Sequence, residues 1–230
     1  KFARIGFTAA LSPECLLCGD ECSYDNWDLC SRCQHYLRFS GERCSQCALP
    51  LTASLTSTAP TICGDCQLHP KPFGRVHAAC IYNATSSHLI YSFKEGHQWQ
   101  PARALCRLLI EQIEGNKQQL TNCTLVPVPC HTSKLRERGF AQASELSRYL
   151  SRKLSLPHQA LLTKNDQGPP QKSLNREQRL KNLSRTFSAA GQVPEHCLLI
   201  DDVMTTGATA IAATNALINA GAKRVDIAVL

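Results

Sequence analysis

The sequence predicts an α/β fold, in which an open and mostly parallel sheet follows an N-terminal metal-binding module. From Val76 onwards, short apolar runs typical of buried strands alternate with longer segments of helical apolar spacing. Such alternation favours parallel strands joined by right-handed crossovers. Residues 13–70 are instead rich in Cys, Pro, Ser and Thr, with little apolar periodicity. We therefore expect two units, residues 1–72 and residues 73–230.

The elements of the second unit follow from these runs. Ligands of an open parallel sheet bind at the carboxyl ends of its strands. The polar stretch from residue 165 to 195 is predicted as a long loop, and loops of that length are usually functional or disordered. Strands are expected at 76–82, 123–129, 160–164, 197–201 and 224–230, and helices at 100–115, 140–154 and 208–222.

Composition and charge exclude some classes of protein. The chain has 230 residues, 43% of them hydrophobic, and its longest apolar runs are shorter than the roughly 20 residues of a membrane helix. We expect no membrane span and a cytoplasmic protein. Arg4 interrupts the apolar start, which favours a short packing segment over a signal peptide. Residues 91–190 hold 16 basic and 7 acidic side chains, so the net charge of +7 is concentrated in the middle of the chain. This basic excess is either a solvated face or a surface for polyphosphate or nucleic acid.

Eight of the fourteen cysteines form four CxxC pairs. Two CxxC turns together provide the four thiolates of a tetrahedral zinc site. The gaps favour pairing in order, although a cross-braced arrangement also satisfies the spacing. Redox activity is the alternative, but four CxxC copies without a thioredoxin context argue against it. Full coordination makes both zinc ions structural, and they would hold together a segment that lacks an apolar core. The two expected sites are Cys15, Cys18, Cys30 and Cys33, and Cys44, Cys47, Cys63 and Cys66.

The other six cysteines follow no spacing pattern and are expected to be small buried apolar residues. They are Cys22, Cys80, Cys106, Cys123, Cys130 and Cys197.

The segment CLLIDDVMTTGATA (197–210) has the chemistry of a phosphate-binding turn. Asp201 and Asp202 end a buried strand, where they could accept hydrogen bonds from ribose hydroxyls or hold Mg²⁺ indirectly. Gly207 allows close approach of the backbone, and the start of the next helix presents amide donors to a phosphate. The ordinary alternative is a strand, an Asp-capped turn and a helix with a threonine N-cap. The residues expected to bind the phosphate are Thr205, Thr206, Gly207, Ala208 and Thr209.

This segment resembles the PRPP-binding signature of type I phosphoribosyltransferases, in which two acids precede a Thr/Gly-rich loop; PRPP is phosphoribosyl pyrophosphate. Together with LVPVPCHTSKLRERGFAQASEL (125–146), PPQKSLNREQRLKNLSRTF (169–187) and the CxxC pairs, it makes nearly the whole chain similar to the ComF family. The resemblance implies a type I phosphoribosyltransferase sheet behind a double zinc ribbon, and a link to competence or the use of foreign DNA. Ala141 stands where that family usually has Asn.

Basic residues complete the expected ligand site. Lys134, Arg136 and Arg138 follow a strand end and could bracket the pyrophosphate of PRPP. Lys94 resembles a family position near the site, and a solvated surface lysine is its alternative. By analogy with type I enzymes, the long loop could close over the pyrophosphate. The candidates on that loop are Lys172, Arg176, Arg179 and Lys181.

Two functions remain open at this stage. An enzyme would displace pyrophosphate from C1 of the ribose with a nitrogen nucleophile, aided by Mg²⁺. A non-enzymatic module would bind single-stranded DNA through the zinc ribbons and the basic face. The resemblance also implies competence-machinery proteins as partners. A purely structural adaptor leaves the acidic pair and the threonine loop unexplained. Whether transfer is catalysed, and to which acceptor, is left open.

Overall fold

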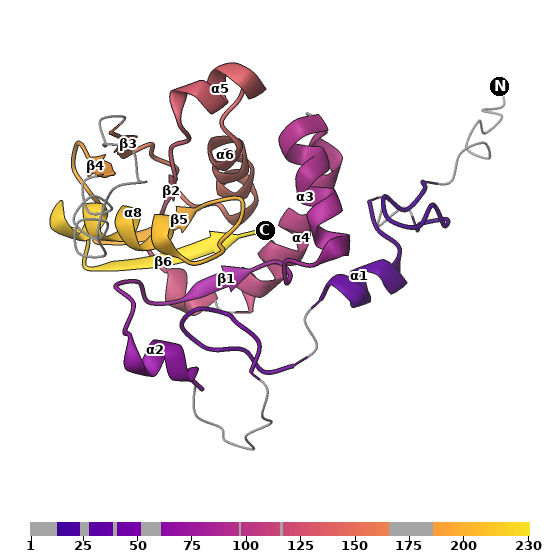
Figure 1. The fold of residues 1–230 in the computed structure, drawn as a ribbon, viewed down its shortest axis with the longest axis horizontal. Helices are drawn as coiled ribbons and strands as arrows, with labels where there is room; N and C mark the ends of the chain where they lie inside the picture. Colours follow the sequence, from indigo (N-terminus) through magenta and orange to yellow (C-terminus); the bar gives the residue numbers. More distant parts are fainter. Residues whose placement is uncertain are drawn as a thin grey trace, which may run out of the picture.

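The computed structural model of the chain describes residues 13–23, 28–38, 41–51, 61–96, 98–115, 117–165 and 186–230. Its centre is a four-stranded parallel sheet in the order β1-β6-β5-β2 (Figure 1). The strands are β1 (Val76–Ala78), β2 (Thr124–Pro127), β5 (His196–Ile200) and β6 (Arg224–Val229). The predicted mixed α/β fold with a mostly parallel sheet is confirmed.

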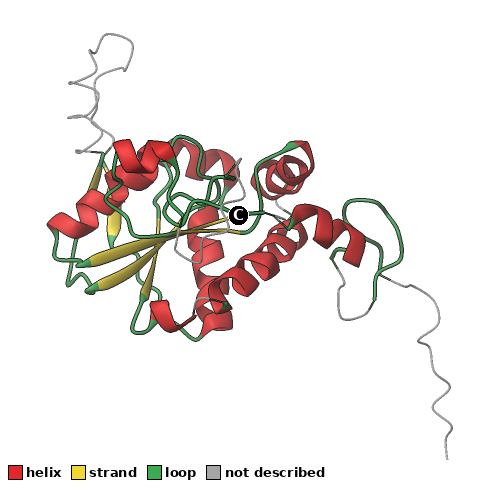
Figure 2. Ribbon diagram, turned by 90° about the horizontal axis from the view of Figure 1, so that it is seen from below, coloured by secondary structure: helices red, strands yellow, loops and turns green. Residues whose placement is uncertain are grey.

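Alternating side chains of the strands serve two cores on opposite faces of the sheet. Leu125, Leu198 and Ile200 pack with α3 (Ala84–Gly96), α4 (Trp99–Glu114) and α6 (Gln142–Leu154). Val126 and Leu199, the neighbours in sequence, pack on the other face with α8 (Ala208–Asn219). The strands are therefore covered on both faces, which accounts for their continuous apolar sequences (Figure 2).

The structure differs from the expected strand at 160–164. Residues Leu162–Lys164 (β3) pair antiparallel with Phe187–Ala189 (β4) in a separate two-stranded sheet. β4 lies inside the stretch predicted as a loop, and Phe187 packs into the core beneath α8. The expectation of parallel pairing fails here because β3 pairs with β4, which runs back beside it, and not with a strand of the central sheet. Two strands that return on each other in this way pair antiparallel.

Within the described α/β part of the chain, the α-helices α3 and α5 (Thr132–Arg138) lie where no helix is expected. α3 begins directly after Asn83, whose side-chain oxygen accepts hydrogen bonds from the backbone amides of Thr85 and Ser86, both at 3.0 Å. The strand predicted at 76–82 is therefore shorter than expected, because only Val76–Ala78 pairs in the sheet and the chain turns into a helix at Ala84. The short helix α5 begins at His131, whose Nδ1 accepts from the Ser133 amide, and ends at Gly139 with φ 72°. A 3-10 helix, η1 (Lys117–Leu120), precedes β2.

The N-terminal segment forms two small units that contact the α/β core. Each ends in a short helix, α1 (Ser31–Leu37) or α2 (Gly64–Leu68). The first unit lies against α4, because the buried Asp28 accepts from Arg103 at 2.6 and 3.1 Å. The second lies along β1, because the Val76 amide donates to the Gln46 carbonyl at 2.9 Å. Figure 1 shows α1 beside α4 and α2 below β1.

No helix in the described part of the chain is both long and apolar enough to cross a membrane.

Candidate functional site

The four CxxC pairs gather into two clusters of four cysteines. The first is Cys15, Cys18, Cys30 and Cys33, and the second is Cys44, Cys47, Cys63 and Cys66; within each, the sulfur atoms all lie within 4.8 Å of one another. Across the two CxxC turns, the Cys18 and Cys30 sulfurs are 3.7 Å apart in the first cluster, and the Cys47 and Cys63 sulfurs are 3.7 Å apart in the second. At a Zn–S distance of about 2.3 Å, the edge of a tetrahedral site is about 3.8 Å. The thiols therefore fit structural zinc, and they follow the order expected from spacing.

The two clusters are built by the same local structure, a repeat that the spacing of the cysteines alone could have suggested. The residue after the second cysteine of the first turn is left-handed in both units, Gly19 at φ 72° and Ala48 at φ 61°. The second CxxC begins the short helix in both. One residue after that CxxC, Gln34 and Gln67 donate to the Leu29 and Ile62 carbonyls, both at 2.8 Å. These shared hydrogen bonds and backbone angles place the four sulfurs of each unit alike.

The second candidate site begins at the carboxyl end of β5, where Asp201 and Asp202 leave the sheet. The Asp201 amide still donates to the Ala228 carbonyl of β6 at 3.1 Å, and the Asp202 amide donates to the Asp201 carboxylate at 2.9 Å. Lys94, from the last turn of α3, places its Nζ 2.8 Å from Asp202 Oδ2. The acidic pair is therefore positioned by a backbone hydrogen bond to β6 at Asp201 and by the ion pair with Lys94 at Asp202.

The electrostatics of this pair favour the uptake of a proton or a metal cation. Burial, and then the neighbouring Asp202 carboxylate, raise the pKa of Asp201 to about 7. Lys94 opposes that shift but does not cancel it. Two carboxylates this close resist ionising together, and a cationic ligand would relieve the repulsion.

A tight turn carries the chain from the acidic pair into α8. Gly207 has φ 75° and is the residue before the helix, so it supplies the left-handed conformation of the turn. Its carbonyl accepts from the Ile211 amide at 2.8 Å as the helix begins. Thr205 and Thr206 are exposed, and the amides of Ala208 and Thr209 lie at the start of the helix, where a phosphate would find donors and the positive end of the helix dipole.

The expected basic segment forms α5, beyond the carboxyl end of β2, the neighbour of β5. Lys134 and Arg136 are exposed on it, whereas Arg138 is partly buried and forms an ion pair with Glu95 of α3. Glu95 is the residue after Lys94. The last turn of α3 therefore touches both the acidic pair and the basic segment. The family resemblance placed Lys94 near the site, as the structure does, whereas the pairing of Glu95 with Arg138 was not predicted.

The expected lid lies outside the described residues, including Lys172, Arg176, Arg179 and Lys181. Its two ends are described. They are the antiparallel strands β3 and β4, joined by the Asn165 amide donating to the Thr186 carbonyl at 2.8 Å. The loop therefore leaves and re-enters the fold at one place, beside α8.

The six cysteines outside the CxxC pairs are mostly core residues, as expected. Cys130 is partly buried, and the other five have at most 6% of their surface exposed. They are Cys22, Cys80, Cys106, Cys123 and Cys197.

Comparison with known proteins matches two parts of the chain to two families. Residues 93–230 match the phosphoribosyl transferase domain family, and residues 7–67 match the double zinc ribbon domain family. The first match contains both acids, the threonine turn and α5, and the second contains both cysteine clusters.

Several curated proteins are similar over most of their length. The DNA utilization protein YhgH of Escherichia coli K12 is 30% identical over 219 residues, 93% of this chain and 94% of that protein. Competence protein F of Haemophilus influenzae is 30% identical over 203 residues, covering 85% and 86%. Competence protein ComFC of Streptococcus pneumoniae is 28% identical over 228 residues, covering 92% and 96%.

Proposed function

We propose, from the premise that the chain belongs to the ComF-type family of phosphoribosyl transferase domain proteins, that it binds PRPP with Mg²⁺ at the end of β5. The observation that carries the proposal is the direct succession of two strand-end carboxylates, a glycine turn and a helix start. In this arrangement Asp201 and Asp202 would take the ribose hydroxyls, and the amides from Thr205 to Thr209 would take the 5′-phosphate. Charge-assisted hydrogen bonds of this kind contribute about 1.5–3 kcal/mol each.

The pyrophosphate of the ligand would face the basic side chains of α5. Lys134 and Arg136 are exposed there, and Arg138 is available to the pyrophosphate if it exchanges its partner Glu95. In a transfer reaction, the lone pair of a nitrogen nucleophile forms a bond to C1 of the ribose. The bond from C1 to the pyrophosphate oxygen breaks, and its electron pair leaves with pyrophosphate. The nucleophile then releases its proton to water. Mg²⁺, when bound, would neutralise charge on the pyrophosphate.

The ribbons complete the proposal as structural elements. Both clusters would hold zinc through four thiolates each, which leaves no open coordination position for chemistry. The names of the relatives connect the family with DNA utilization and competence, and we extend that role to this chain as a cytoplasmic protein. Competence-machinery proteins are included as partners on the same ground.

Ligand binding is tested by the melting temperature of the zinc-loaded chain with and without Mg²⁺ and PRPP. We expect PRPP to raise it only when Mg²⁺ is present, and the double change Asp201→Asn and Asp202→Asn to abolish the rise. Asp20→Asn, an exposed acid in the first ribbon, is the matched control and should keep it. An unchanged melting temperature of the wild-type chain would overturn the proposal. Release of pyrophosphate with a base or amine would show that it is an enzyme.

A second candidate is a non-enzymatic module that binds single-stranded DNA. The observation that favours it is the exposure of Lys134 and Arg136 on α5, in the basic middle of the chain. Affinity based on phosphate contacts falls steeply with salt. We therefore expect Lys134→Ala and Arg136→Ala to weaken the binding of an oligonucleotide and to reduce its salt dependence. A flat salt response of the wild-type chain would exclude this candidate.

A further inference from the structure

The last turn of α3 places two residues of opposite charge at the candidate site. Lys94 Nζ lies 2.8 Å from Asp202 Oδ2, at the acidic end of β5. Glu95 Oε1 lies 2.5 Å from a terminal nitrogen of Arg138, the last residue of α5. Carboxylates attract Mg²⁺ and guanidinium groups attract phosphate, so each α3 side chain has the charge that the proposed ligand would bring to the same partner. The two side chains therefore occupy positions that the ligand would need.

The backbone that carries Glu95 is fixed relative to α5. Phe93, two residues earlier, is 1% exposed, and its ring centroid lies 5.6 Å from that of Phe140. Phe140 follows Gly139, which ends α5 directly after Arg138. Apolar packing thus holds the two segments together without the ion pair. Glu95 can therefore leave Arg138 by rotating its side chain, with no movement of the helix.

The ion pair between Glu95 and Arg138 is suited to exchange. The Glu95 side chain is 35% exposed and can be hydrated when it leaves, whereas the Arg138 side chain is 16% exposed and stays largely covered. Glu95 satisfies only a terminal nitrogen. Arg138 Nε is buried and has no hydrogen-bond partner among the residues that the structure describes. A phosphate group has several acceptor oxygens and can pair with both nitrogens together, so it offers Arg138 an acceptor that Glu95 does not.

We propose that Glu95 sets the affinity of the site as an internal competitor, which takes the place of a pyrophosphate oxygen at Arg138 and is displaced when the ligand binds. The inference rests on the proposed function, because it assigns Arg138 to the pyrophosphate end of the ligand. Glu95 acts on the ligand only through Arg138. Binding is weakened because the existing ion pair must first break, and a neutral side chain at position 95 removes that requirement.

The test measures the affinity of the zinc-loaded full chain for inorganic pyrophosphate with Mg²⁺, and for PRPP with Mg²⁺, by isothermal titration calorimetry. Glu95→Gln keeps the size of the side chain and removes its charge. We expect this variant to bind both ligands about fivefold more tightly, the scale of one partly exposed ion pair. Glu195→Gln is the matched control, because Glu195 also pairs at 2.5 Å, with Lys223, but lies at the opposite, amino end of β5. It should bind as the wild-type chain does.

A second background separates competition for the guanidinium from a general effect of charge. Competition requires Arg138, so adding Glu95→Gln to Arg138→Gln should bring no gain in affinity for pyrophosphate. A gain of the same size in both backgrounds would mean that Glu95 acts by its charge alone, and the inference would be wrong.

The two ligands also distinguish this inference from the proposed function. If Glu95→Gln binds pyrophosphate as the wild-type chain does, or more weakly, the inference is overturned, and the proposed function stands as long as PRPP raises the melting temperature of the wild-type chain. If Glu95→Gln binds pyrophosphate more tightly but PRPP binds to neither protein, the competition is supported and the proposed function is lost. If neither ligand binds to either protein, both are wrong.

Discussion

Lys94 of α3 and Asp202 at the end of β5 form an ion pair of 2.8 Å that connects a helix to the acidic end of the central strand. The side chains are only 23% and 18% exposed, so the pair is shielded from solvent more than an ordinary surface pair. The next residue, Glu95, holds Arg138 of α5. One turn of α3 therefore sets the positions of both charges that the proposed ligand would contact.

Removing the positive charge of Lys94 should raise the pKa of the nearby Asp201. We expect Lys94→Met to raise the pKa of Asp201 above its wild-type value of about 7, because Lys94 is a charge that lowers it. Carbon-detected NMR titration of the aspartate carboxyls measures this directly. Lys223→Met is the control, since Lys223 pairs with Glu195 on the exposed surface and should leave Asp201 as it is. An unaltered Asp201 titration in Lys94→Met would show that the ion pair is not formed in solution.

The raised pKa of Asp201 also predicts how its contribution to stability depends on pH. The folded chain holds this proton more tightly than the unfolded chain, so the contribution is complete below pH about 4 and is lost as the pH rises through about 7. His77 acts in the opposite direction, since burial lowers its pKa to about 4. The useful quantity is therefore the difference in unfolding free energy between the wild-type chain and Asp201→Asn. We expect the unfolding free energy of the wild-type chain, relative to that of Asp201→Asn, to fall between pH 4.5 and 7, by at most about 1.4 kcal/mol per pH unit. A difference that does not vary with pH contradicts the shift.

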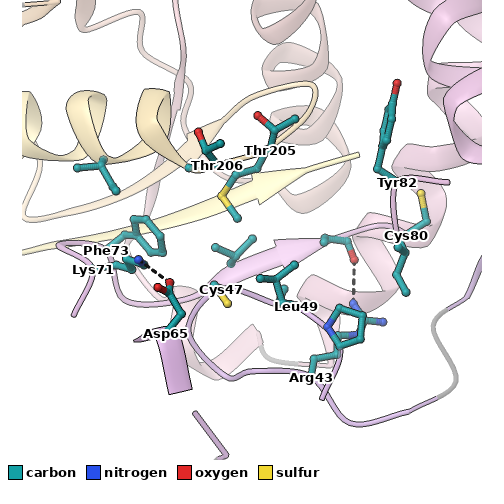
Figure 3. A pocket seen from close by; sticks show the side chains of 18 residues that line it. Arg43, Cys47, Leu49, Asp65, Lys71, Phe73, Cys80, Tyr82, Thr205 and Thr206 are labelled. Carbon is teal, nitrogen blue, oxygen red and sulfur yellow. Dashed lines mark hydrogen bonds and ion pairs between the residues drawn. The ribbon is translucent and has the colours of Figure 1, made fainter. Parts of the chain in front are cut away.

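The sequence predicts the acidic pair, the turn and α8 because they are consecutive, and local rules act on consecutive residues. The grouping of the cysteines follows from short gaps for the same reason. By contrast, α5 has no buried residue and so shows no apolar periodicity. The Lys94–Asp202 ion pair joins segments that are far apart in the sequence. The hollow lined by Tyr82 and by the turn before α8 does the same (Figure 3). Both form only when the chain is folded. β4 is three residues long and only Phe187 is buried in it, which is too little signal for a strand.

Asp28 should be one of the residues that hold the first ribbon on the core, beside the Arg38–Glu111 pair. Its side chain is 4% exposed and accepts two hydrogen bonds from Arg103, with Arg107 at 3.3 Å. Asp28→Ala leaves arginines that water can still reach, so we expect a loss of about 1–3 kcal/mol in unfolding free energy. Hydrogen exchange in α1 should also become faster. Asp20→Ala breaks an exposed pair with Arg32 and should cost less than about 1 kcal/mol. Equal losses in the two variants would refute the anchoring role.

Gly19, a residue with positive φ in the first ribbon, allows the cost of that backbone conformation to be measured. Gly19 has φ 72° with open space around an added Cβ, so the effect of Gly19→Ala is conformational only. We expect a loss of about 1–2 kcal/mol in unfolding free energy of the zinc-loaded chain. Gly64→Ala, in α2 and also in open space, is the control and should be neutral or slightly stabilising. Ala48 occupies the equivalent position at φ 61° in the second unit, so this turn tolerates a Cβ and Gly19→Ala should still bind two zinc ions. Loss of zinc from that variant would contradict this expectation.

Gly74 should be intolerant of a side chain for a different reason, because a Cβ there would lie 2.5 Å from Asp226 Oδ1. Asp226 is fully buried and accepts from the Arg75 amide and His196 Nε2, both at 2.9 Å. The carboxylate has no room to move without breaking those bonds. Overpacking of this kind costs about 1–3 kcal/mol, so Gly74→Ala should lower the unfolding free energy by that amount.

Gly74 also begins the segment that carries β1, and the Val76 amide of β1 holds the second ribbon through the Gln46 carbonyl. We therefore expect Gly74→Ala to weaken the attachment of the second ribbon, seen as faster hydrogen exchange at the Val76 amide, while Gly64→Ala leaves that rate unchanged. A Val76 amide as protected in Gly74→Ala as in the wild-type chain would show that the turn adjusts without moving β1.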